Sequence, residues 1–547
     1  MLFLARRAVR QFAMSDEQTQ TAKKASQKAR VFLTAADMAK QQREISVSEF
    51  FTKNRHLLGF DNPRRALLTT VKEAVDNSLD ACEEAGILPD VSVHIEQTNG
   101  DNRFRVRVRD NGPGIVQTQI PRVFGKLLYG SKFHRLKMSR GQQGIGISAA
   151  GMYGHLTTGQ PITIISKIGP KAPAHYYQIV INTKENEPKI LKEETLEWDA
   201  EQGTQVEIEL EGTFQRGLWS VDEYLEQTAA ANPHVTLRYR APDGAEQVFE
   251  RATSILPPEP KEIKPHPYGI ELGMLIGMLH DTKCHTVQTF LQNDFCRVSK
   301  RTALEICQRA GIYENARPKR IAVQEVDKLL KAIHETKLMK PPMDCIVPIG
   351  MELVEAGMRK HFKADFYSSV TRPPTVYRGI PFVIEAGVAY GVGGREDSQA
   401  KVMRFANRVP LLYNTGACAI THAVTKINWR QYNVEQSNGS PPTGPLVVLV
   451  HMASPWVPFT SESKEAIAPY PEIEKEIMLA VQECARGLRR YLSGRRRHAE
   501  EMRKREYIEK YIPHIGEALQ DILRFGDSER AALVSKLTDV LERSRGG

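Results

Sequence analysis

The chain has 547 residues, of which 41% are hydrophobic and 7% aromatic, and it carries a formal net charge of +10. This length predicts three or four domains, and the composition suits ordinary α/β material. The positive balance favours an anionic partner such as DNA. Seven scattered cysteines without a Cys-x-x-Cys pair argue for a reducing compartment and against a zinc site, and no run is apolar enough to span a membrane.

The first 44 residues, rich in Gln, Lys, Ala and Thr after position 14, predict a mobile N-terminal arm. Met1 to Ala13 contains three arginines and no acidic residue, as an organelle transit peptide does. We favour an upstream start codon instead, with Met14 as the true start, because this stretch is short. The expected location is the cytoplasm or nucleoid, with organelle targeting as the alternative.

The most informative segment lies in a run from Arg65 to Ala85 with helical periodicity. Its apolar residues can cover one face, and Glu73, Asp76, Asn77 and Asp80 share the other. A carboxylate and a carboxamide one turn apart suit a base for a water molecule and an oxygen ligand for Mg²⁺. A solvated acidic helix face is the alternative interpretation, and the motifs that follow favour the site.

A strand with clean alternation, Phe104 to Arg109, leads into Asp110-Asn-Gly112-Pro-Gly114. A carboxylate at the exit of a strand can accept a hydrogen bond from the exocyclic amine of adenine. The two glycines let the backbone come close to a flat ligand. A plain turn after an edge strand is the alternative, because Asn-Gly is a common turn pair.

A glycine-rich loop follows and runs into an apolar helix of small residues. Backbone N–H groups of such a loop, together with the helix N-terminus, make an anion cradle. The spacing matches neither the dinucleotide fingerprint nor a Walker A loop. The candidate binding residues of this loop are Gly141, Gln142, Gln143, Gly144, Ile145, Gly146, Ile147 and Ser148. Further on, Gly203-Thr204 opens a strand that runs to Leu210.

This ordered set resembles the Bergerat-fold ATPases, also called the GHKL group, which includes gyrase B, heat-shock chaperones, histidine kinases and MutL. The resemblance implies that Glu73 activates water for attack on the γ-phosphate of ATP, and that Asn77 ligates Mg²⁺. It also implies that Asp110 binds adenine. The nucleotide-binding set that it implies further includes Asp80, Gly112, Gly114, Thr204 and a lid from Gly141 to Ser148.

Three later motifs narrow the resemblance. They are Lys264-Pro-His-Pro-Tyr-Gly269, Arg404-Phe-Ala-Asn407-Arg408-Val-Pro410 and Trp456-Val-Pro-Phe-Thr-Ser-Glu-Ser-Lys464. In order and spacing they look like the B subunits of DNA topoisomerase VI, and the resemblance covers most of the chain. It implies that Lys464 is a switch lysine that reaches the γ-phosphate, and that Ser131 and Lys132 also contact phosphate.

The resemblance implies an ATP-dependent type II DNA topoisomerase. Two B subunits would dimerise on binding ATP and capture double-stranded DNA. With two A subunits they would form an A₂B₂ heterotetramer, in which hydrolysis drives strand passage through a break made by the A subunit, relaxing and decatenating DNA. The alternatives are another GHKL ATPase and a non-hydrolysing scaffold for DNA or a partner. Residues 1–44 contain no histidine, which argues against a histidine kinase.

The expected fold is a multidomain α/β protein. Its parts are the arm at 1–44, a GHKL ATPase domain at 45–258, a helix-two-turns-helix domain at 261–340, an α/β transducer domain at 343–471, and a stalk helix with an A-subunit docking tail at 472–547. The arginine-rich stalk predicts a solvated helix, with contact to DNA phosphates as the alternative, and Gly494 is expected to weaken or bend it. The apolar tail stripe at Ile522, Leu523, Leu533, Leu537 and Leu541 predicts docking, with a hairpin folded back on the stalk as the alternative.

Overall fold

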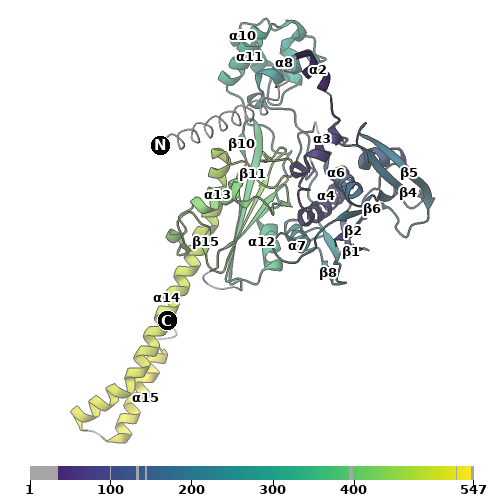
Figure 1. The fold of residues 1–547 in the computed structure, drawn as a ribbon. Helices are drawn as coiled ribbons and strands as arrows, with labels where there is room; N and C mark the ends of the chain where they lie inside the picture. The colour runs from purple at the N-terminus through teal and green to yellow at the C-terminus, as the bar shows by residue number, and fades with distance from the viewer. Residues whose placement is uncertain are drawn as a thin grey trace, which may run out of the picture.

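The computed structural model describes residues 35–42, 44–98, 100, 102–130, 135–141, 144–393, 398–524 and 526–543. The predictions for most of the arm, and for Ser131, Lys132, Gln142 and Gln143, fall outside these residues. Figure 1 shows one sheet with its helices beside a second sheet, a cluster of helices above them, and a long helix that projects away. No helix among the described residues combines the length and apolar composition that a membrane crossing requires.

The first sheet has eight strands in the order β5-β4-β3-β6-β2-β1-β7-β8, and only β1 and β7 pair in parallel. Its strands are β1 (Asp90–Gln97), β2 (Arg103–Asp110), β3 (Ile162–Lys167), β4 (Ala174–Asn182), β5 (Glu187–Leu196), β6 (Gly203–Glu211), β7 (Thr236–Arg240) and β8 (Glu246–Phe249). The helices of this part are α2 (Ala35–Gln41), α3 (Val47–Lys53), α4 (Pro63–Glu84), α5 (Ile120–Gly125), α6 (Gly146–Thr158) and α7 (Val221–Ala231).

Local sequence explains how α4 is placed across this sheet. The side chain of Asn62 accepts a hydrogen bond from the N–H of Arg65, and Pro63 occupies the first turn, so the helix start is fixed. Strand β2 alternates buried apolar residues with half-exposed or exposed arginines, so its apolar face lies under the helices. The buried residues of α4 pack on that face, and they include Leu67, Val71, Val75 and Leu79.

Four helices form the cluster above the sheets in Figure 1: α8 (Leu272–Asp281), α9 (Val287–Asn293), α10 (Lys300–Ala310) and α11 (Val323–Glu335). They enclose a hydrophobic core of their own around Phe290, Ile306 and Leu329. The Pro-His-Pro-Tyr motif precedes α8, and its side chains hydrogen-bond the segment that follows α11. The ring of His266 lies 3.0 Å from the carbonyl of Met339, and the hydroxyl of Tyr268 donates to the carbonyl of Thr336 at 2.6 Å.

The second sheet runs β10-β11-β16-β12-β13, with β9 also paired to β11. Its strands are β9 (Phe366–Thr371), β10 (Thr375–Tyr377), β11 (Ile380–Tyr390), β12 (Lys401–Ala406), β13 (Val409–Pro410) and β16 (Leu446–Ala453), and β14 (Glu435–Gln436) pairs with β15 (Pro442–Thr443). Helices α12 (Met351–His361) and α13 (Ala419–Lys426) accompany it. Every residue of β16 is buried, as expected for a central strand covered on both faces.

The chain then enters α14 (Pro471–Leu523) and α15 (Asp527–Arg543). The first turns of α14 bury Ile473, Ile477 and Val481 against the second sheet, and the helix then leaves the body of the molecule (Figure 1). It continues as one helix through Gly494 and Pro513. The expectation that Gly494 weakens or bends the helix stays a prediction.

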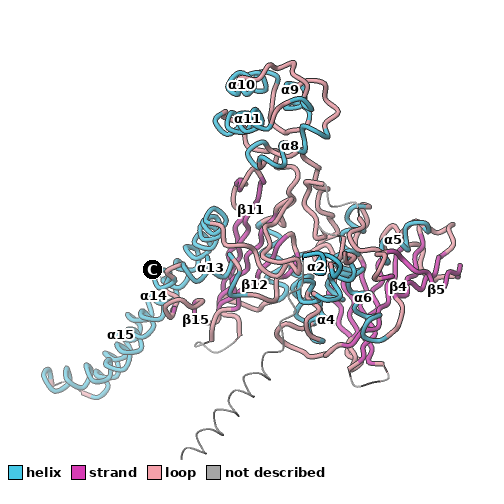
Figure 2. Tube along the Cα trace, turned by 45° about the horizontal axis from the view of Figure 1, so that its top comes forward, coloured by secondary structure: helices cyan, strands magenta, loops and turns pink. Residues whose placement is uncertain are grey.

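Helix α15 folds back along the end of α14. A Cβ at Gly516 of α14 would lie 2.7 Å from a methyl group of Val534, which places the two helices in close contact. Leu533, Leu537 and Leu541 are half-buried in this hairpin. The hairpin named as the alternative therefore forms and partly covers these three residues, whereas Ile522 and Leu523 of the same stripe are exposed. Docking of the tail to a partner stays a prediction. Figure 2 shows the same hairpin from a second direction.

Candidate functional site

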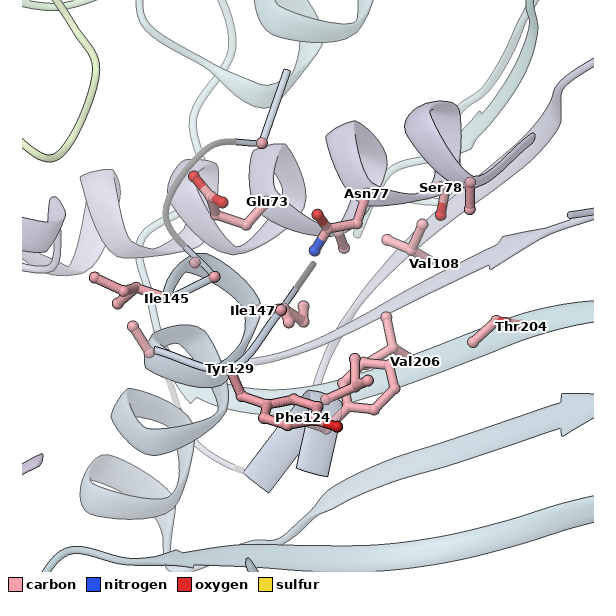
Figure 3. A pocket seen from close by; sticks show the side chains of 18 of the residues that line it. Glu73, Asn77, Ser78, Val108, Phe124, Tyr129, Ile145, Ile147, Thr204 and Val206 are labelled. Atoms are coloured by element: carbon pink, nitrogen blue, oxygen red, sulfur yellow. The ribbon is translucent and has the colours of Figure 1, made fainter. Parts of the chain in front are cut away.

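A cavity of about 570 Å³ lies in the first sheet's domain between α4, the end of β2 and the start of α6. It is closed on one side by a loop of the second sheet's domain, Glu462 to Lys464. Figure 3 shows the side chains of Glu73 and Asn77 on α4 at this cavity, with Ile147, Phe124 and Val206 near them. The predicted site residues that line it are Glu73, Asn77, Asp110, Gly114, Gly141, Gly144, Ile145, Gly146, Ile147, Thr204 and Lys464.

Asp110 is buried at one end of the cavity and is held in a fixed orientation. Its Oδ1 accepts hydrogen bonds from the N–H groups of Gly112 at 2.9 Å and Thr204 at 3.1 Å. Its Oδ2 accepts one from the hydroxyl of Ser78 at 2.8 Å. Burial raises the pKa of this carboxyl above its usual value, although these three hydrogen bonds oppose the rise.

The walls next to Asp110 are apolar and close together. Val108 and Val206 come from neighbouring strands, and Phe124 comes from α5. Gly114 has a φ of +71°, and a Cβ there would lie 2.3 Å from the carbonyl oxygen of Lys167. A side chain at this position would therefore push the loop away from the sheet. A carboxylate at the end of an apolar slot suits a flat heterocycle that carries an exocyclic amine.

The middle of the cavity is formed by one face of α4. Within residues 66–82, all of which the structure describes, Asn77 is the one exposed residue. It lines the cavity. Its amide is therefore available to a ligand. Glu73 lies one turn earlier on the same face, where the N–H groups at the start of α6 approach it.

The start of α6 lies directly against Glu73. A Cβ at Gly146 would lie 1.7 Å from Oε2 of Glu73, so only glycine permits this approach. The first N–H groups of a helix have no partner within the helix, and they favour negative charge. The end of the cavity opposite Asp110 is thus lined by glycine backbone and the start of α6, an arrangement that suits an anion.

Lys464 reaches the same end from the tip of a hairpin-like loop. Phe459 bridges to Ile467, and the N–H of Lys464 bonds to the carbonyl of Ser461 at 3.0 Å, with φ of +52° at Lys464. Its Nζ donates to the carbonyl of Arg140 at 3.1 Å. The next residue, Glu465, forms an ion pair with Arg65 of α4. Arg65 also donates to the hydroxyl of Ser463 at 3.3 Å. The loop is therefore anchored to the first domain on both sides of the lysine.

Charge is closely balanced at this end. Burial raises the pKa of Glu73, but the neighbouring cations Lys72, at 3.3 Å, and Lys464 outweigh it, so the net pKa is lowered. Burial lowers the pKa of Lys464, and Glu73 opposes that change. A carboxylate that stays ionised next to an anion cradle can accept a proton from a water molecule.

Of the predicted binding residues that the structure describes, three lie outside the cavity lining. Asp80 pairs with Arg140 at 3.0 Å and accepts the N–H of Gly141 at 3.1 Å. Gly112 supports Asp110, and the hydroxyl of Ser148 donates to carbonyls of Val123 and Lys126, each at 3.1 Å. They support residues of the cavity instead of lining it, because their polar groups are used within the protein.

Sequence reasoning missed several residues that the site uses. Ser78 fixes the orientation of Asp110, Lys72 adjoins Glu73, and Arg65 anchors the loop of Lys464. The helical pattern places Lys72 and Ser78 beside Glu73 and Asn77, so those two had a local signal. No local pattern predicts the contact of Arg65 with Ser463, which lies about 400 positions away in the sequence.

Two family models match the chain. One described as Histidine kinase-, DNA gyrase B-, and HSP90-like ATPase covers residues 62–213, and one described as Topoisomerase VI B subunit, transducer covers residues 341–505. The DNA gyrase B-subunit from Myxococcus xanthus matches with a TM-score of 0.39 at 11% identity, over 81% of this chain and 95% of that chain. A TM-score of 0.39 is too low to support a conclusion about this chain.

Similarity to curated proteins is much higher. The B subunit of type 2 DNA topoisomerase 6 from Methanococcoides burtonii is 52% identical over 490 residues, which cover 89% of this chain and 79% of that protein. The protein of the same name from Methanosarcina acetivorans is 50% identical over 504 residues, covering 92% and 81%. The one from Archaeoglobus fulgidus is 45% identical over 509 residues, covering 93% and 84%.

Proposed function

The chain belongs to the family of type 2 DNA topoisomerase 6 B subunits, and we propose that its cavity hydrolyses Mg·ATP to drive strand passage. Family membership confirms the predicted fold class, the binding of ATP and the function as an ATP-dependent type II topoisomerase. Family membership does not establish the roles of single residues, the use of Mg²⁺ or the composition of the assembly. These three points make up the proposal.

The nucleotide is oriented by the two unlike ends of the cavity. Adenine would lie in the apolar slot between Val108 and Phe124, with its amine donating to Asp110. The triphosphate would then extend towards Gly141, Gly144 and the start of α6, where backbone N–H groups favour anions. A purine with a carbonyl in place of the amine would present an acceptor to an acceptor, so guanine is expected to bind poorly.

The observation that carries the proposal is the placement of Glu73. It is an acid with a lowered pKa, on the same helix face as Asn77 and against the start of α6. Asn77 offers an amide oxygen of the kind that Mg²⁺ prefers, and Mg²⁺ would neutralise phosphate charge when bound. Glu73 would accept the proton of the attacking water, and Lys464 would face the developing negative charge.

Lys464 links this chemistry to the transducer. The lysine belongs to the loop between β16 and α14, and α14 is the helix that leaves the body of the molecule. A change of charge at the phosphate end therefore acts on the base of the stalk. We expect hydrolysis to move α14 through this loop, and with it any protein attached to the stalk.

The partners follow from the same assignment. We expect an A₂B₂ heterotetramer with topoisomerase VI A subunits, B–B dimerisation on ATP binding, and double-stranded DNA as substrate in the nucleoid. Exposed apolar side chains remain on the distal stalk at Tyr507, Ile508, Tyr511 and Ile515. We propose these four as the docking surface for the A subunit.

The direct test is an activity assay with and without the A subunit. The full chain alone should hydrolyse ATP but leave supercoiled DNA uncut and unrelaxed. The mixture with the A subunit should relax it only with ATP and Mg²⁺, and removal of Mg²⁺ by EDTA should stop both activities. Deletion of residues 507–547 should spare ATP binding but prevent co-purification with the A subunit. Relaxation by the isolated chain would contradict the proposal.

The scaffold alternative makes a different prediction. A non-hydrolysing relative would bind an ATP analogue yet show no turnover above background, with or without DNA. A steady-state ATPase assay on the wild-type chain separates the two, because a positioned general base raises the rate by about 10²–10⁴.

A further inference from the structure

A two-residue turn of the transducer contacts the start of the nucleotide lid. It joins β12 to β13 and consists of Asn407 and Arg408, whose φ angles are +48° and +66°. Two consecutive residues with positive φ form the turn that asparagine and glycine favour in tight hairpins. Arginine has no such preference, so this backbone needs contacts that hold it in place.

The contacts that hold the turn reach into the ATPase domain. The amide of Asn407 donates to the carbonyl of Ser139 at 2.9 Å. The guanidinium of Arg408 lies 3.8 Å from a carboxylate oxygen of Glu83, at the end of α4. Glu83 in turn binds Arg140 at 2.6 Å and 3.0 Å. The turn therefore contacts both the backbone before Arg140 and the carboxylate that holds its side chain.

Arg140 is the residue before Gly141, the first residue of the proposed lid. Its guanidinium also binds Asp80 at 3.0 Å, and the second oxygen of Asp80 accepts the N–H of Gly141 at 3.1 Å. Lys464 binds the carbonyl of the same arginine at 3.1 Å. Arg140 is thus held at its carbonyl by one transducer residue and, through Glu83, at its side chain by another.

The four charged groups of this cluster are largely removed from water. Two are acids, Asp80 and Glu83, and two are bases, Arg140 and Arg408, so the cluster is balanced only while all four remain. Burial raises the pKa of Glu83, but Arg140 outweighs it and lowers the pKa well below its usual value. Loss of one member of a buried set leaves another charge uncompensated, so its partners must move.

On the transducer side the turn is tied to the centre of the sheet. The N–H of Arg408 donates to Nε2 of His451 at 2.9 Å, and Nδ1 of His451 lies 2.8 Å from Glu385. Glu385 accepts the N–H groups of Ile349 at 2.8 Å and Gly350 at 2.7 Å, at the start of α12. These hydrogen bonds connect the turn to β16 through His451 and to the start of α12 through Glu385.

We propose that Arg408 is a positioning residue for ATP hydrolysis, which holds Arg140 and the first glycine of the lid through the shared carboxylate of Glu83. The transducer then acts on the lid at two points, Arg408 and Lys464. This inference depends on the proposed function of the cavity, because Arg408 can position the lid for hydrolysis only if the cavity binds ATP.

The test compares two buried arginines of the same hairpin in the full chain. Arg408→Met removes the contact with Glu83. Arg404→Met is the matched control, because the guanidinium of Arg404 donates to the carbonyls of Leu411 at 2.6 Å and Tyr413 at 2.9 Å, within the transducer. The measurements are kcat for ATP, the Kd of a non-hydrolysable ATP analogue, and deuterium uptake across residues 135–150 with that analogue bound.

We expect Arg408→Met to lower kcat about 5- to 50-fold and to raise deuterium uptake in the lid, with Kd changed by less than about threefold. Arg404→Met should leave kcat and lid uptake near wild type. The double variant Glu83→Gln/Arg408→Met should be no slower than Glu83→Gln alone, because residues in one network do not contribute additively.

Equal kcat and equal lid uptake in Arg408→Met and Arg404→Met would overturn the proposal, as would additive losses in the double variant. If Arg408→Met does not fold, Arg408→Gln decides, because glutamine keeps a polar side chain but removes the charge that faces Glu83. Wild-type kcat and lid uptake in that variant would overturn the proposal. A wild-type chain without ATPase activity would instead contradict the proposed function.

Discussion

Replacing Asp110 with asparagine tests the adenine end of the cavity, and the structure fixes how the new side chain must lie. Two backbone N–H groups, from Gly112 and Thr204, point at Oδ1 of Asp110. The carbonyl oxygen of asparagine must take that place, so its NH₂ group takes the place of Oδ2, beside Ser78. The hydroxyl of Ser78 can rotate and accept from it, whereas the amine of adenine cannot.

In the variant, adenine loses one charge-assisted hydrogen bond. The NH₂ group of asparagine then faces the amine of adenine, and both groups are donors. A hydrogen bond to a charged group contributes about 1.5–3 kcal/mol. This loss corresponds to ATP binding weaker by about 10- to 150-fold. The fold should be retained, because each of the three hydrogen bonds within the protein keeps a partner.

Titration of the wild type and of Asp110→Asn with non-hydrolysable ATP and GTP analogues measures this effect. Asp90→Asn is the control, since Asp90 pairs with Arg238 at 3.2 Å, away from the cavity lining. The wild type should prefer ATP strongly over GTP. An unchanged Kd in Asp110→Asn, or equal binding of ATP and GTP by the wild type, would refute the assignment of Asp110 to adenine.

Three further predictions concern the phosphate end. Asn77→Ala should weaken binding of the Mg²⁺-loaded analogue in a titration, and an unchanged Kd would exclude the metal-ligand role. Lys464→Ala should keep the Kd for the analogue but lower kcat about tenfold or more, whereas the transducer variant Lys426→Ala should hydrolyse ATP normally; equal rates would make Lys464 a structural lysine. Because the pKa of Glu73 is lowered from its ordinary value of 4.5, this base loses its charge only below that pH. A pH profile of kcat should therefore show no loss between about pH 8 and pH 6 from this group, and a Glu73-dependent fall in that range would contradict it.

Local pattern in the sequence was sufficient for the elements that carry the site. The stripe that contains Glu73 and Asn77 lies on one helix because residues one turn apart on a helix are neighbours whatever the rest of the chain does. The glycine-rich stretch likewise leads into α6, and the predicted long helix is present as α14, which begins at Pro471. These features depend on spacings of a few residues, which a single sequence displays directly.

Contacts between distant segments were not visible in the sequence. Nothing in the pattern of α4 shows that Asp80 pairs with Arg140 instead of facing a ligand. The buried set of Glu83, Arg140 and Arg408 joins residues from two domains, and each looks like an ordinary surface charge in its own segment. For the tail, one apolar stripe fits both a partner and the chain's own stalk, and the structure shows that Leu533 and Leu537 are half-buried beside the stalk.

The central claim is that Glu73 is the base for ATP hydrolysis, and Glu73→Gln tests it most directly. Asp76→Asn is the control, since Asp76 lies on the same helix, also near Lys72, but binds the hydroxyl of Tyr224 at 2.9 Å and does not line the cavity. Steady-state turnover and analogue binding should be measured on both variants. We expect kcat of Glu73→Gln to fall about 10²- to 10⁴-fold with Kd nearly unchanged, while Asp76→Asn turns over close to wild type. Turnover by Glu73→Gln within about threefold of wild type would contradict the account.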